Sequence, residues 1–300
     1  MDMVRSLRDI VELAKARGTK TCVVVAAEDP EVLLAMDEAV THGIARSILI
    51  GNLRGIEEAA DTAGVDISKH ELVEEDDPPT AARRGVQLVS EGKANLVVKG
   101  LVSTSNVLKA VLGKDGGLRT GRLLSHLSVF EMPGSDRLVI FSDGAMNISP
   151  SLEEKAEITQ NAIDVAHVLG MTNPRVAIIA AIEYLNSDMP ATIDAACISK
   201  MAERGQIKGG IVDGPLALDN AISPESARIK GIRSPVAGRA DILIMPDIEA
   251  GNVFYKTLVY MADGCCASVV TGAGAPVVLT SRSDSHASKF YSLALGIVLS

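Results

Sequence analysis

TCVVVAAEDPEVLLAMDEAVTHGIARSILIG, residues 21–51, is the stretch that decides the fold. Its apolar run at 21–27 predicts a fully buried strand, and the acid and proline that open 28–43 predict the start of a helix. The second apolar run, at 46–51, predicts another buried strand. Strand, helix and strand in this order indicate a βαβ unit, in which the two strands lie parallel.

The same alternation continues on both sides of this unit. Helices are expected at 4–17, 55–63, 80–92, 151–169, 192–204, 217–230, 252–263 and 286–298. Strands are expected at 94–100, 175–181, 209–215, 240–247, 268–273 and 276–281. Ser151 and Glu154 have the spacing of a capping box at the start of one of these helices. The pattern therefore predicts an α/β fold built on a mainly parallel sheet.

One segment departs from this rhythm. LSVFEMP (127–133) and RLVIFSDG (137–144) are both typical of strands, yet only a few residues around Pro133 and Gly134 separate them. A parallel crossover needs a dozen residues or more, so this connection predicts an antiparallel hairpin. We interpret the hairpin as an insert in a mixed sheet and as the border between two domains.

The composition is that of a globular chain and restricts its partners. Of 300 residues, 47% are hydrophobic and 22% charged, with no Trp, four Phe and four Tyr, so the core must consist of aliphatic side chains. The formal net charge of −9 argues against broad nucleic-acid binding, which needs a basic face. If the substrate is an anion, the positive field that binds it must be local.

The cysteines and the amino terminus carry no specific signal. Cys22, Cys197, Cys265 and Cys266 lack C-x-x-C spacing and histidines at zinc-site intervals, so we interpret them as small hydrophobic residues. The first residues lack the apolar core of a signal peptide, and no apolar run approaches the ~18 residues of a membrane span. We therefore expect a cytoplasmic protein that binds neither membrane nor nucleic acid.

Polar residues end or follow several predicted strands at the edge where ligands of α/β sheets bind, beyond the carboxyl ends. They are Ser103-Thr104-Ser105, Asp213-Gly214-Pro215, Asp247 with the nearby Asn252, and Ser281-Arg282-Ser283-Asp284. Hydroxyls, helix-start amides and an arginine are the groups that bind a small anion or a phosphate. The alternative is that such residues gather in loops only because loops need turns and caps.

Familiar catalytic and cofactor motifs are absent from the sequence. It contains no G-x-x-x-x-G-K-[ST], no strand-borne G-x-G-x-x-G, no H-E-x-x-H and no G-x-S-x-G. Of the five scattered histidines, only His126 and His286 lie near the proposed site. Without an activated serine or thiol, direct transfer between two bound substrates is favoured over a covalent enzyme intermediate.

The segment DGPLALDNAISPESARIKGIRSPVAGRADILIMPDIEAGN, residues 213–252, resembles the phosphate acetyltransferase and phosphate butyryltransferase family. Further similar segments are VVKGLVSTS (97–105), LLSHLSVFE (123–131), FSDGAMNISPS (141–151) and TSRSDS (280–285). The residues of LLSHLSVFE and TSRSDS are more similar to the butyryltransferase branch than to the acetyltransferase branch. The resemblance extends over roughly the last two thirds of the chain.

This resemblance implies the reaction acyl-CoA plus phosphate in exchange for acyl phosphate plus CoA, with butyryl preferred and acetyl as the alternative. It implies a homo-oligomer and no metal or organic cofactor, CoA being a substrate. It also implies two α/β domains with a cleft between them, similar to isocitrate and isopropylmalate dehydrogenase. We place the first domain at 1–132 plus 285–300, the second at 133–284, and the active site in the cleft.

The resemblance also suggests roles for individual residues. The serine and arginine that match Ser281 and Arg282 serve the phosphoryl or acyl-phosphate group, and Asp284 is the nearest carboxylate to act as base for the CoA thiol. Asp213, Asp247 or water are the alternatives for the base. The expected substrate-binding residues are Ser103, Thr104, Ser105, Lys109, Asp213, Gly214, Pro215, Ser234, Asp247, Asn252 and Ser283.

Two other classes of function remain open at this point. A metal-dependent decarboxylating dehydrogenase would have the implied fold and could use Asp213, Asp219 and Asp247, but no nucleotide motif accompanies them. A sensor of CoA or acyl phosphate would keep the fold without the chemistry, which the Ser281-Arg282 pair disfavours.

Overall fold

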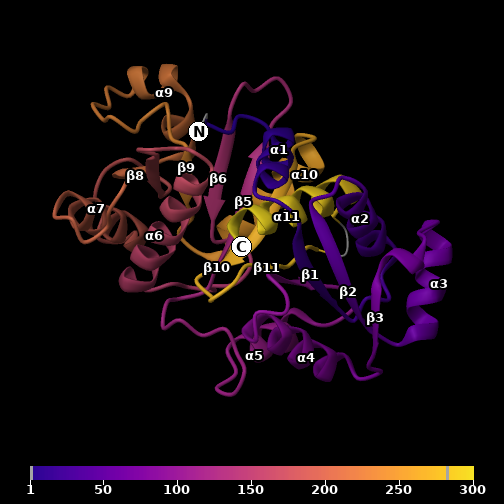
Figure 1. Cartoon of the computed structure of the whole chain (residues 1–300). Coiled ribbons are helices and arrows are strands. Elements are labelled where there is room, and N and C mark those ends of the chain that lie inside the picture. Colours follow the sequence, from indigo (N-terminus) through magenta and orange to yellow (C-terminus); the bar gives the residue numbers. More distant parts are fainter. Residues whose placement is uncertain (1–2, 282–283) are drawn as a thin grey trace. The chain divides into compact units, whose positions relative to one another are not determined.

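The computed structural model describes residues 3–281 and 284–300 and divides into two compact units. One unit consists of Leu7–Arg122 and Cys266–Ser300, and the other of Met1–Ser6 and Leu123–Cys265. We call them the Leu7 unit and the Leu123 unit after their longest segments. Each unit contains strands of a sheet flanked by helices, so the expected α/β class is confirmed (Figure 1).

The strands of the Leu7 unit lie in the order β3-β2-β1-β4-β11-β10. Their bounds are Glu71–Glu74 for β3, Ala45–Gly51 for β2, Lys20–Val25 for β1, Leu96–Lys99 for β4, Val277–Val278 for β11 and Cys265–Thr271 for β10. β1 pairs in parallel with β2 and β4, which confirms the βαβ unit predicted from residues 21–51. β11 is parallel to β4 but antiparallel to β10.

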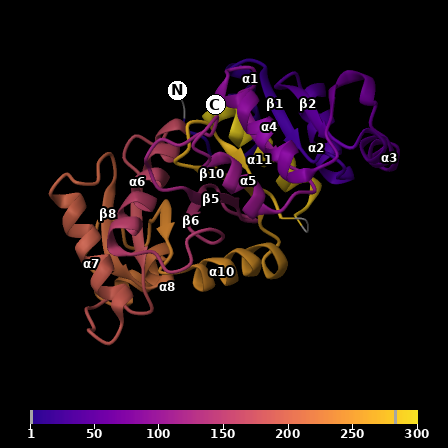
Figure 2. The ribbon, with the colours of Figure 1, turned by 90° about the horizontal axis from the view of Figure 1, so that it is seen from below.

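Helices cover both faces of these strands. Their bounds are Leu7–Ala16 for α1, Pro30–Thr41 for α2, Leu53–Ala63 for α3, Pro78–Ser90 for α4, Thr104–Val111 for α5 and His286–Leu299 for α11. Gly85 of α4 packs against Val23 and Val25, whereas Gly296 of α11 packs against Leu96 and Val278. Because Val23 pairs with Val97, the residues that meet α4 and those that meet α11 alternate along the strands and point to opposite faces. α4 and α5 lie side by side (Figure 2).

In the Leu123 unit the strand order is β5-β6-β9-β7-β8. The bounds are Ser125–Glu131 for β5, Leu138–Ser142 for β6, Ile242–Ile244 for β9, Arg175–Ile179 for β7 and Ile211–Leu216 for β8. β5 and β6 form the predicted antiparallel hairpin, and β6, β9, β7 and β8 run parallel to their neighbours. The helices are α6 at Leu152–Val168, α7 at Pro190–Glu203, α8 at Leu218–Ile222, α9 at Pro224–Ile229 and α10 at Ile248–Met261.

The structure corrects three expectations about helices. The continuous helix expected at 217–230 is wrong, because the chain breaks at Ser223 before Pro224, a residue that cannot donate a helical hydrogen bond. The helix expected to begin at 252 begins at Ile248, since the Asp247 side chain accepts a 2.8 Å hydrogen bond from the Ala250 amide. α5 was not expected at all. The capping box of Ser151 and Glu154 is confirmed.

Aliphatic residues dominate the core, and a small aromatic cluster supplements them in the Leu123 unit. Phe130, Phe141 and Tyr255 pack with ring centroids 5.5–6.3 Å apart. Cys22 is fully buried, and burial raises the pKa of its thiol to about 12. Across the described residues, none of the helices combines the length and the apolar character that crossing a membrane requires.

Candidate functional site

The ends of β4 and β11 bring two of the predicted site segments to one edge of the Leu7 unit. The two strands are parallel neighbours, with Val98 opposite Val278, so both carboxyl ends leave the sheet on the same side. One end leads through Gly100 to Ser103 and α5, and the other leads through Thr280 to Ser281 and α11. The register therefore places the serine segment 103–105 and Ser281 after adjacent strand ends.

The serine segment forms the start of α5. The Ser103 side chain is the N-cap and accepts a 3.2 Å hydrogen bond from the Asn106 amide. Thr104 and Ser105 follow in the first turn and are exposed, so their hydroxyls and amides are accessible to an anion. Just before this turn, the backbone of Gly100 packs directly against the backbone of Ala26. A Cβ on Gly100 would lie 2.0 Å from the Ala26 carbonyl oxygen.

In the second segment, the described residues Ser281 and Asp284 contact each other, whereas Arg282 and Ser283 lie outside the described residues. Oδ2 of Asp284 accepts a 2.7 Å hydrogen bond from the Ser281 amide, and the Asp284 amide donates to the Ser281 carbonyl at 3.1 Å. Asp284 is buried, with 8% of its surface exposed, and Ser281 is partly exposed. The carboxylate predicted as a base is therefore engaged with the backbone that carries Ser281.

Lys289 of α11 supports the same loop. Its ammonium donates a 2.7 Å hydrogen bond to the Asp284 carbonyl oxygen, and only 3% of the residue is exposed. The sequence analysis did not identify Lys289, nor the buried Lys99 that ends β4. A charged residue inside an otherwise apolar strand or helix pattern was the signal available for both, since lysine is almost never buried without a polar partner.

The other predicted residues lie in the Leu123 unit, where Asp247 and Asn252 belong to the start of α10. Asp247 is the N-cap, and Asn252 Nδ2 donates to the Gly144 carbonyl at 3.3 Å. A Cβ on Gly251 would lie 2.3 Å from the Asp143 carbonyl oxygen, so the backbones of α10 and the loop after β6 are in direct contact.

Asp143 organises that loop and was missed by the sequence analysis. Its buried carboxylate accepts hydrogen bonds from the amides of His126, Ala145 and Met146 and from the Asn147 side chain, at 2.7–3.0 Å. Four donors compensate the burial of this charge. FSDG in the sequence was the available signal, an acid directly after a buried strand.

Asp213, Gly214 and Pro215 lie inside β8, not beyond its end, because the strand continues to Leu216. The strand expected at 209–215 is confirmed, and these three residues are among its last four. Gly214 packs closely on β7, since a Cβ there would lie 2.8 Å from the Ile178 carbonyl oxygen. Ser234 belongs to a separate turn, in which its hydroxyl accepts from the amides of Val236 and Ala237.

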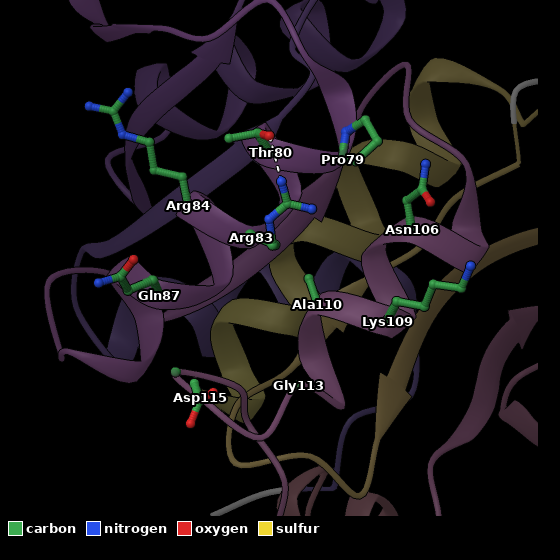
Figure 3. A pocket seen from close by; sticks show the side chains of 11 residues that line it. Pro79, Thr80, Arg83, Arg84, Gln87, Asn106, Lys109, Ala110, Gly113 and Asp115 are labelled. Atoms are coloured by element: carbon green, nitrogen blue, oxygen red, sulfur yellow. Dashed lines mark hydrogen bonds between the residues drawn. The ribbon is translucent and has the colours of Figure 1, made fainter.

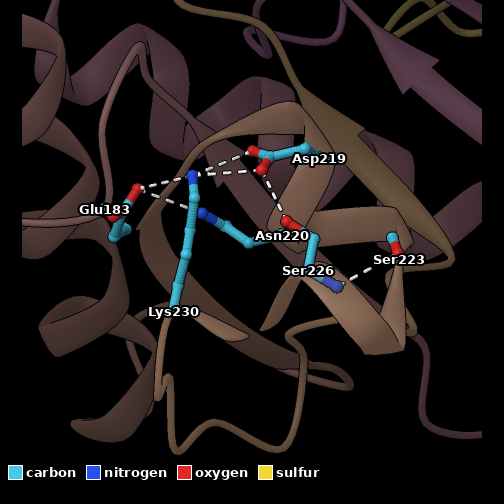
Figure 4. Close-up of polar contacts among 6 residues, drawn as sticks. All are labelled: Glu183, Asp219, Asn220, Ser223, Ser226 and Lys230. Atoms are coloured by element: carbon cyan, nitrogen blue, oxygen red, sulfur yellow. Dashed lines mark hydrogen bonds and ion pairs between the residues drawn. The ribbon is translucent and has the colours of Figure 1, made fainter. Parts of the chain in front are cut away.

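A polar cluster joins the loop after β7 to α8 and α9 (Figure 4). Lys230 Nζ lies 3.2 Å from Glu183 Oε2 and 3.1 Å from Asp219 Oδ2. The hydrogen bonds of Ser226 and Lys230 hold the pKa of Asp219 below its usual value, and the Asp219 carboxylate raises the pKa of Lys230. Asp219, which the dehydrogenase alternative could have used to bind a metal, is thus paired with Lys230.

Within residues 3–281 and 284–300, no group of three His, Cys, Asp or Glu side chains lies close enough together to hold a metal ion.

Of the predicted site residues, the structure brings Ser103, Thr104 and Ser105 to the strand end next to that of Ser281 and Asp284, within the Leu7 unit. Lys109 lies on α5, one turn and a half beyond these serines. Asp213, Gly214, Pro215, Ser234, Asp247 and Asn252 all belong to the Leu123 unit.

Comparison with known proteins gives consistent matches. Residues 80–297 match a family model described as Phosphate acetyl/butaryl transferase. A phosphate butyryltransferase from Clostridium acetobutylicum is 48% identical over 297 residues, which are 99% of this chain and 99% of that protein. A phosphate acetyltransferase from Thermotoga maritima is 44% identical, covering 97% of this chain and 99% of its own length.

Among solved structures, a branched-chain phosphotransacylase from Enterococcus faecalis V583 has a TM-score of 0.83 at 31% identity. The match covers 93% of this chain and 98% of that one. The fold class expected from the resemblance, of the dehydrogenase type, is therefore confirmed.

Proposed function

Because the chain belongs to the phosphate acetyl/butyryl transferase family, we propose that it exchanges CoA and phosphate on a butyryl group. The chain is a phosphate acyltransferase: butyryl-CoA and inorganic phosphate give butyryl phosphate and CoA, and the reverse. The single observation that carries this function is the 48% identity to a phosphate butyryltransferase along the whole chain. Acetyl is the second candidate for the acyl group, since a phosphate acetyltransferase is 44% identical over nearly the same length.

The proposed phosphate site lies at the carboxyl ends of β4 and β11. In acyl phosphate synthesis a phosphate oxygen attacks the thioester carbonyl carbon, and the carbon–sulfur bond breaks to release CoA as a thiolate that takes up a proton. The Ser103, Thr104 and Ser105 hydroxyls and the free amides at the start of α5 suit the phosphate oxygens. Ser281 and Arg282 would hold the same anion, and a guanidinium supports charge that grows during transfer.

The proposed base for the CoA thiol in the reverse direction is Asp284. A free thiol of this type has a pKa near 8.5, so a carboxylate beside it and a positive field would increase the thiolate fraction. Asp213, Asp247, Asn252 and their neighbours in the Leu123 unit remain the proposed contacts for the rest of the substrate.

The remaining parts of the proposal concern partners and assembly. We expect no metal or organic cofactor beyond CoA as a substrate, a homo-oligomer, and a place in the cytoplasm. The expected insensitivity to chelators, the mass in solution and cell fractionation test these points separately.

The deciding experiment measures thiol release from acetyl-, propionyl- and butyryl-CoA, with and without phosphate and with EDTA. Phosphate-dependent, EDTA-insensitive release that is fastest with butyryl-CoA supports the proposal. One methylene in an apolar pocket discriminates by only ~1–3 kcal/mol, so the three thioesters should differ in rate but not absolutely. Binding of acyl-CoA without turnover would indicate a sensor, and release that needs a metal would indicate other chemistry.

Arg282→Ala tests the phosphate site. Removing one preorganised donor to developing charge typically costs about 100-fold in turnover, and we expect at least that loss with an unchanged circular dichroism spectrum. Turnover equal to that of the wild type would show that another residue stabilises the transferred phosphate.

A further inference from the structure

The basic pocket between α4 and α5 contains Lys109, one of the expected substrate-binding residues, and so adds nothing beyond the reaction already proposed (Figure 3). A different pocket, in the Leu123 unit, is lined by none of the residues named for that reaction. Its volume is about 610 Å³, within the range of small-molecule sites. We call it the arginine pocket, because its charged lining residues are Arg5, Asp136, Arg137, Arg175, Arg239 and Asp241.

The arginine pocket lies at the amino ends of three parallel strands. Arg137 directly precedes β6, Arg175 is the first residue of β7, and Asp241 directly precedes β9. β9 pairs in parallel with both β6 and β7, so these three ends leave the sheet at one edge. Asp143 and Asp247 follow the opposite ends of β6 and β9, and six residues of extended chain, about 20 Å, separate Arg137 from Asp143. The pocket is therefore remote from the carboxyl ends, where ligands of α/β sheets bind.

Positive charge exceeds negative charge in this pocket, although the whole chain carries −9. One of its two acids, Asp241, is already engaged. Its Oδ2 accepts a 2.9 Å hydrogen bond from the Arg175 amide, and its Oδ1 lies 3.6 Å from Nη1 of Arg137. The same Nη1 donates a 2.9 Å hydrogen bond to the Ala240 carbonyl oxygen. The guanidinium of Arg137 is thus neutralised and fixed in place.

The other two arginines at this edge have no such partner. Across residues 3–281 and 284–300, the side chains of Arg175 and Arg239 make no hydrogen bond or ion pair. Arg175 is half-buried and Arg239 is exposed. Two guanidiniums at one pocket repel each other, and an anion with two charges is stabilised by both. A phosphate monoester carries nearly two charges at pH 7 and accepts bidentate hydrogen bonds from arginine, so it fits this pair.

The rest of the lining favours a ligand larger than inorganic phosphate. Its apolar members are Met3, Val4, Leu138, Met171, Ile222 and Pro224. The Val4 amide donates a 3.1 Å hydrogen bond to the Leu169 carbonyl oxygen, which fixes the amino-terminal segment beside α6. An apolar body next to the phosphate would cover these side chains. The fixed, planar guanidinium of Arg137 offers a face on which an aromatic base can stack.

We propose that the arginine pocket binds a nucleoside monophosphate, with its phosphate on Arg175 and Arg239 and its base against Arg137 and the apolar wall. This site goes beyond the proposed function, because it takes part in neither the transfer nor the binding of the acyl group. CoA itself contains an adenosine phosphate, so the experiment must separate the pocket from the substrate site.

Calorimetric titration of AMP into wild type, Arg239→Gln and Arg204→Gln tests the site. Arg204 is exposed at the end of α7 in the same unit and controls for the loss of a surface charge. We expect Arg239→Gln to weaken AMP binding about tenfold, the effect of losing one charge-assisted hydrogen bond. Arg204→Gln should bind AMP as the wild type does, and Arg239→Lys should recover part of the loss, because lysine keeps the charge without the planar fork.

Two further measurements define the ligand and separate the sites. Adenosine and inorganic phosphate should each bind the wild type at least tenfold more weakly than AMP, because each occupies only part of the pocket. The KM for butyryl-CoA should stay within twofold of the wild type in Arg239→Gln.

Several results would overturn the proposal. Absence of AMP binding to the wild type, or equal affinity in Arg239→Gln, would exclude the pocket as a nucleotide site. Adenosine that binds as tightly as AMP would show that the arginines do not contact the ligand, and phosphate that binds as tightly would show a site for small anions. A rise in KM for butyryl-CoA in Arg239→Gln that equals the loss of AMP affinity would assign the pocket to the substrate.

Discussion

The Lys289 ammonium and the Asp284 carbonyl oxygen, which both belong to buried residues, are joined by a 2.7 Å hydrogen bond beside the start of α11. The same aspartate accepts the Ser281 amide through its side chain. One buried lysine thus supports the loop that carries two of the three residues proposed for catalysis.

Lys289→Met should therefore destabilise the protein. The substitution keeps a similar volume but leaves the buried Asp284 carbonyl without this donor, which typically costs about 1–3 kcal/mol. Urea unfolding measures the loss, and Lys114→Met on the exposed surface is the control, with an expected change below about 0.5 kcal/mol. Equal unfolding free energies for wild type and Lys289→Met would show that the contact does not stabilise the loop.

The Asp284→Asn variant tests whether Asp284 acts as a base or only stabilises the loop. Asparagine can still accept the Ser281 amide through its carbonyl oxygen, but it cannot take a proton from the CoA thiol. We expect the CoA-consuming direction to slow about 100-fold, with a flatter pH profile, while the unfolding free energy changes little. Asp284→Ala should lose both rate and stability. A full rate and an unchanged pH profile in Asp284→Asn would move the role of base to Asp213, Asp247 or water.

Gly100→Ala tests the close approach before α5. Its Cβ would lie 2.0 Å from the Ala26 carbonyl oxygen and 3.1 Å from that of Val25, and both are backbone atoms of β1 and its end. Forcing the two segments apart should cost about 1–3 kcal/mol and disturb the serine segment that follows. Gly274→Ala, whose Cβ would meet nothing nearer than 3.5 Å, is the matched control. A thermal melt of Gly100→Ala coincident with that of Gly274→Ala would contradict the expectation.

His70 should make stability fall in mild acid. Burial lowers the pKa of His70 below its usual value, against the opposing charge of Asp37, and its Nδ1 shares a 2.5 Å hydrogen bond with Ser47 Oγ. The unfolded chain then binds a proton near pH 6.5 that the folded chain does not, so the free energy of unfolding decreases as the pH falls through that value.

Urea unfolding at pH 7.5 and pH 5.5 measures this decrease. His70→Gln should show a smaller difference between the two pH values than the wild type, because glutamine does not titrate. The same difference in both proteins would assign the acid sensitivity to other groups.

Local pattern was sufficient for much of the fold. The apolar runs around residues 21–51 and at 94–100 predicted buried strands, because a buried parallel strand needs apolar side chains on both faces. The short connection around Pro133 and Gly134 allowed only a hairpin. α5 was missed because it has only eight residues and follows a polar segment that was interpreted as a loop, and the break before Pro224 was missed although the proline was visible in the sequence.

The candidate site was predictable in its residue types but not in its arrangement. Runs of Ser, Asp and Gly after apolar segments indicated strand ends, and Ser103–Ser105 and Ser281 do lie at such ends. Asp213, Gly214 and Pro215 are among the last residues of β8, which ends at Leu216. Lys99, Asp143 and Lys289 were overlooked because nothing in a local pattern shows which charged side chains become buried.

By itself the sequence determined the alternation of strands and helices, the hairpin, and the family, because each depends on the order of residue types along the chain. The tertiary structure decided that β11, only two residues long, lies beside β4, so that serines nearly 180 positions apart leave neighbouring strands. It also decided that one face of α4 meets one face of α5 around a basic pocket. Such neighbours arise from strand pairing and helix packing between distant segments, and the periodicity of one segment contains no information about its partner.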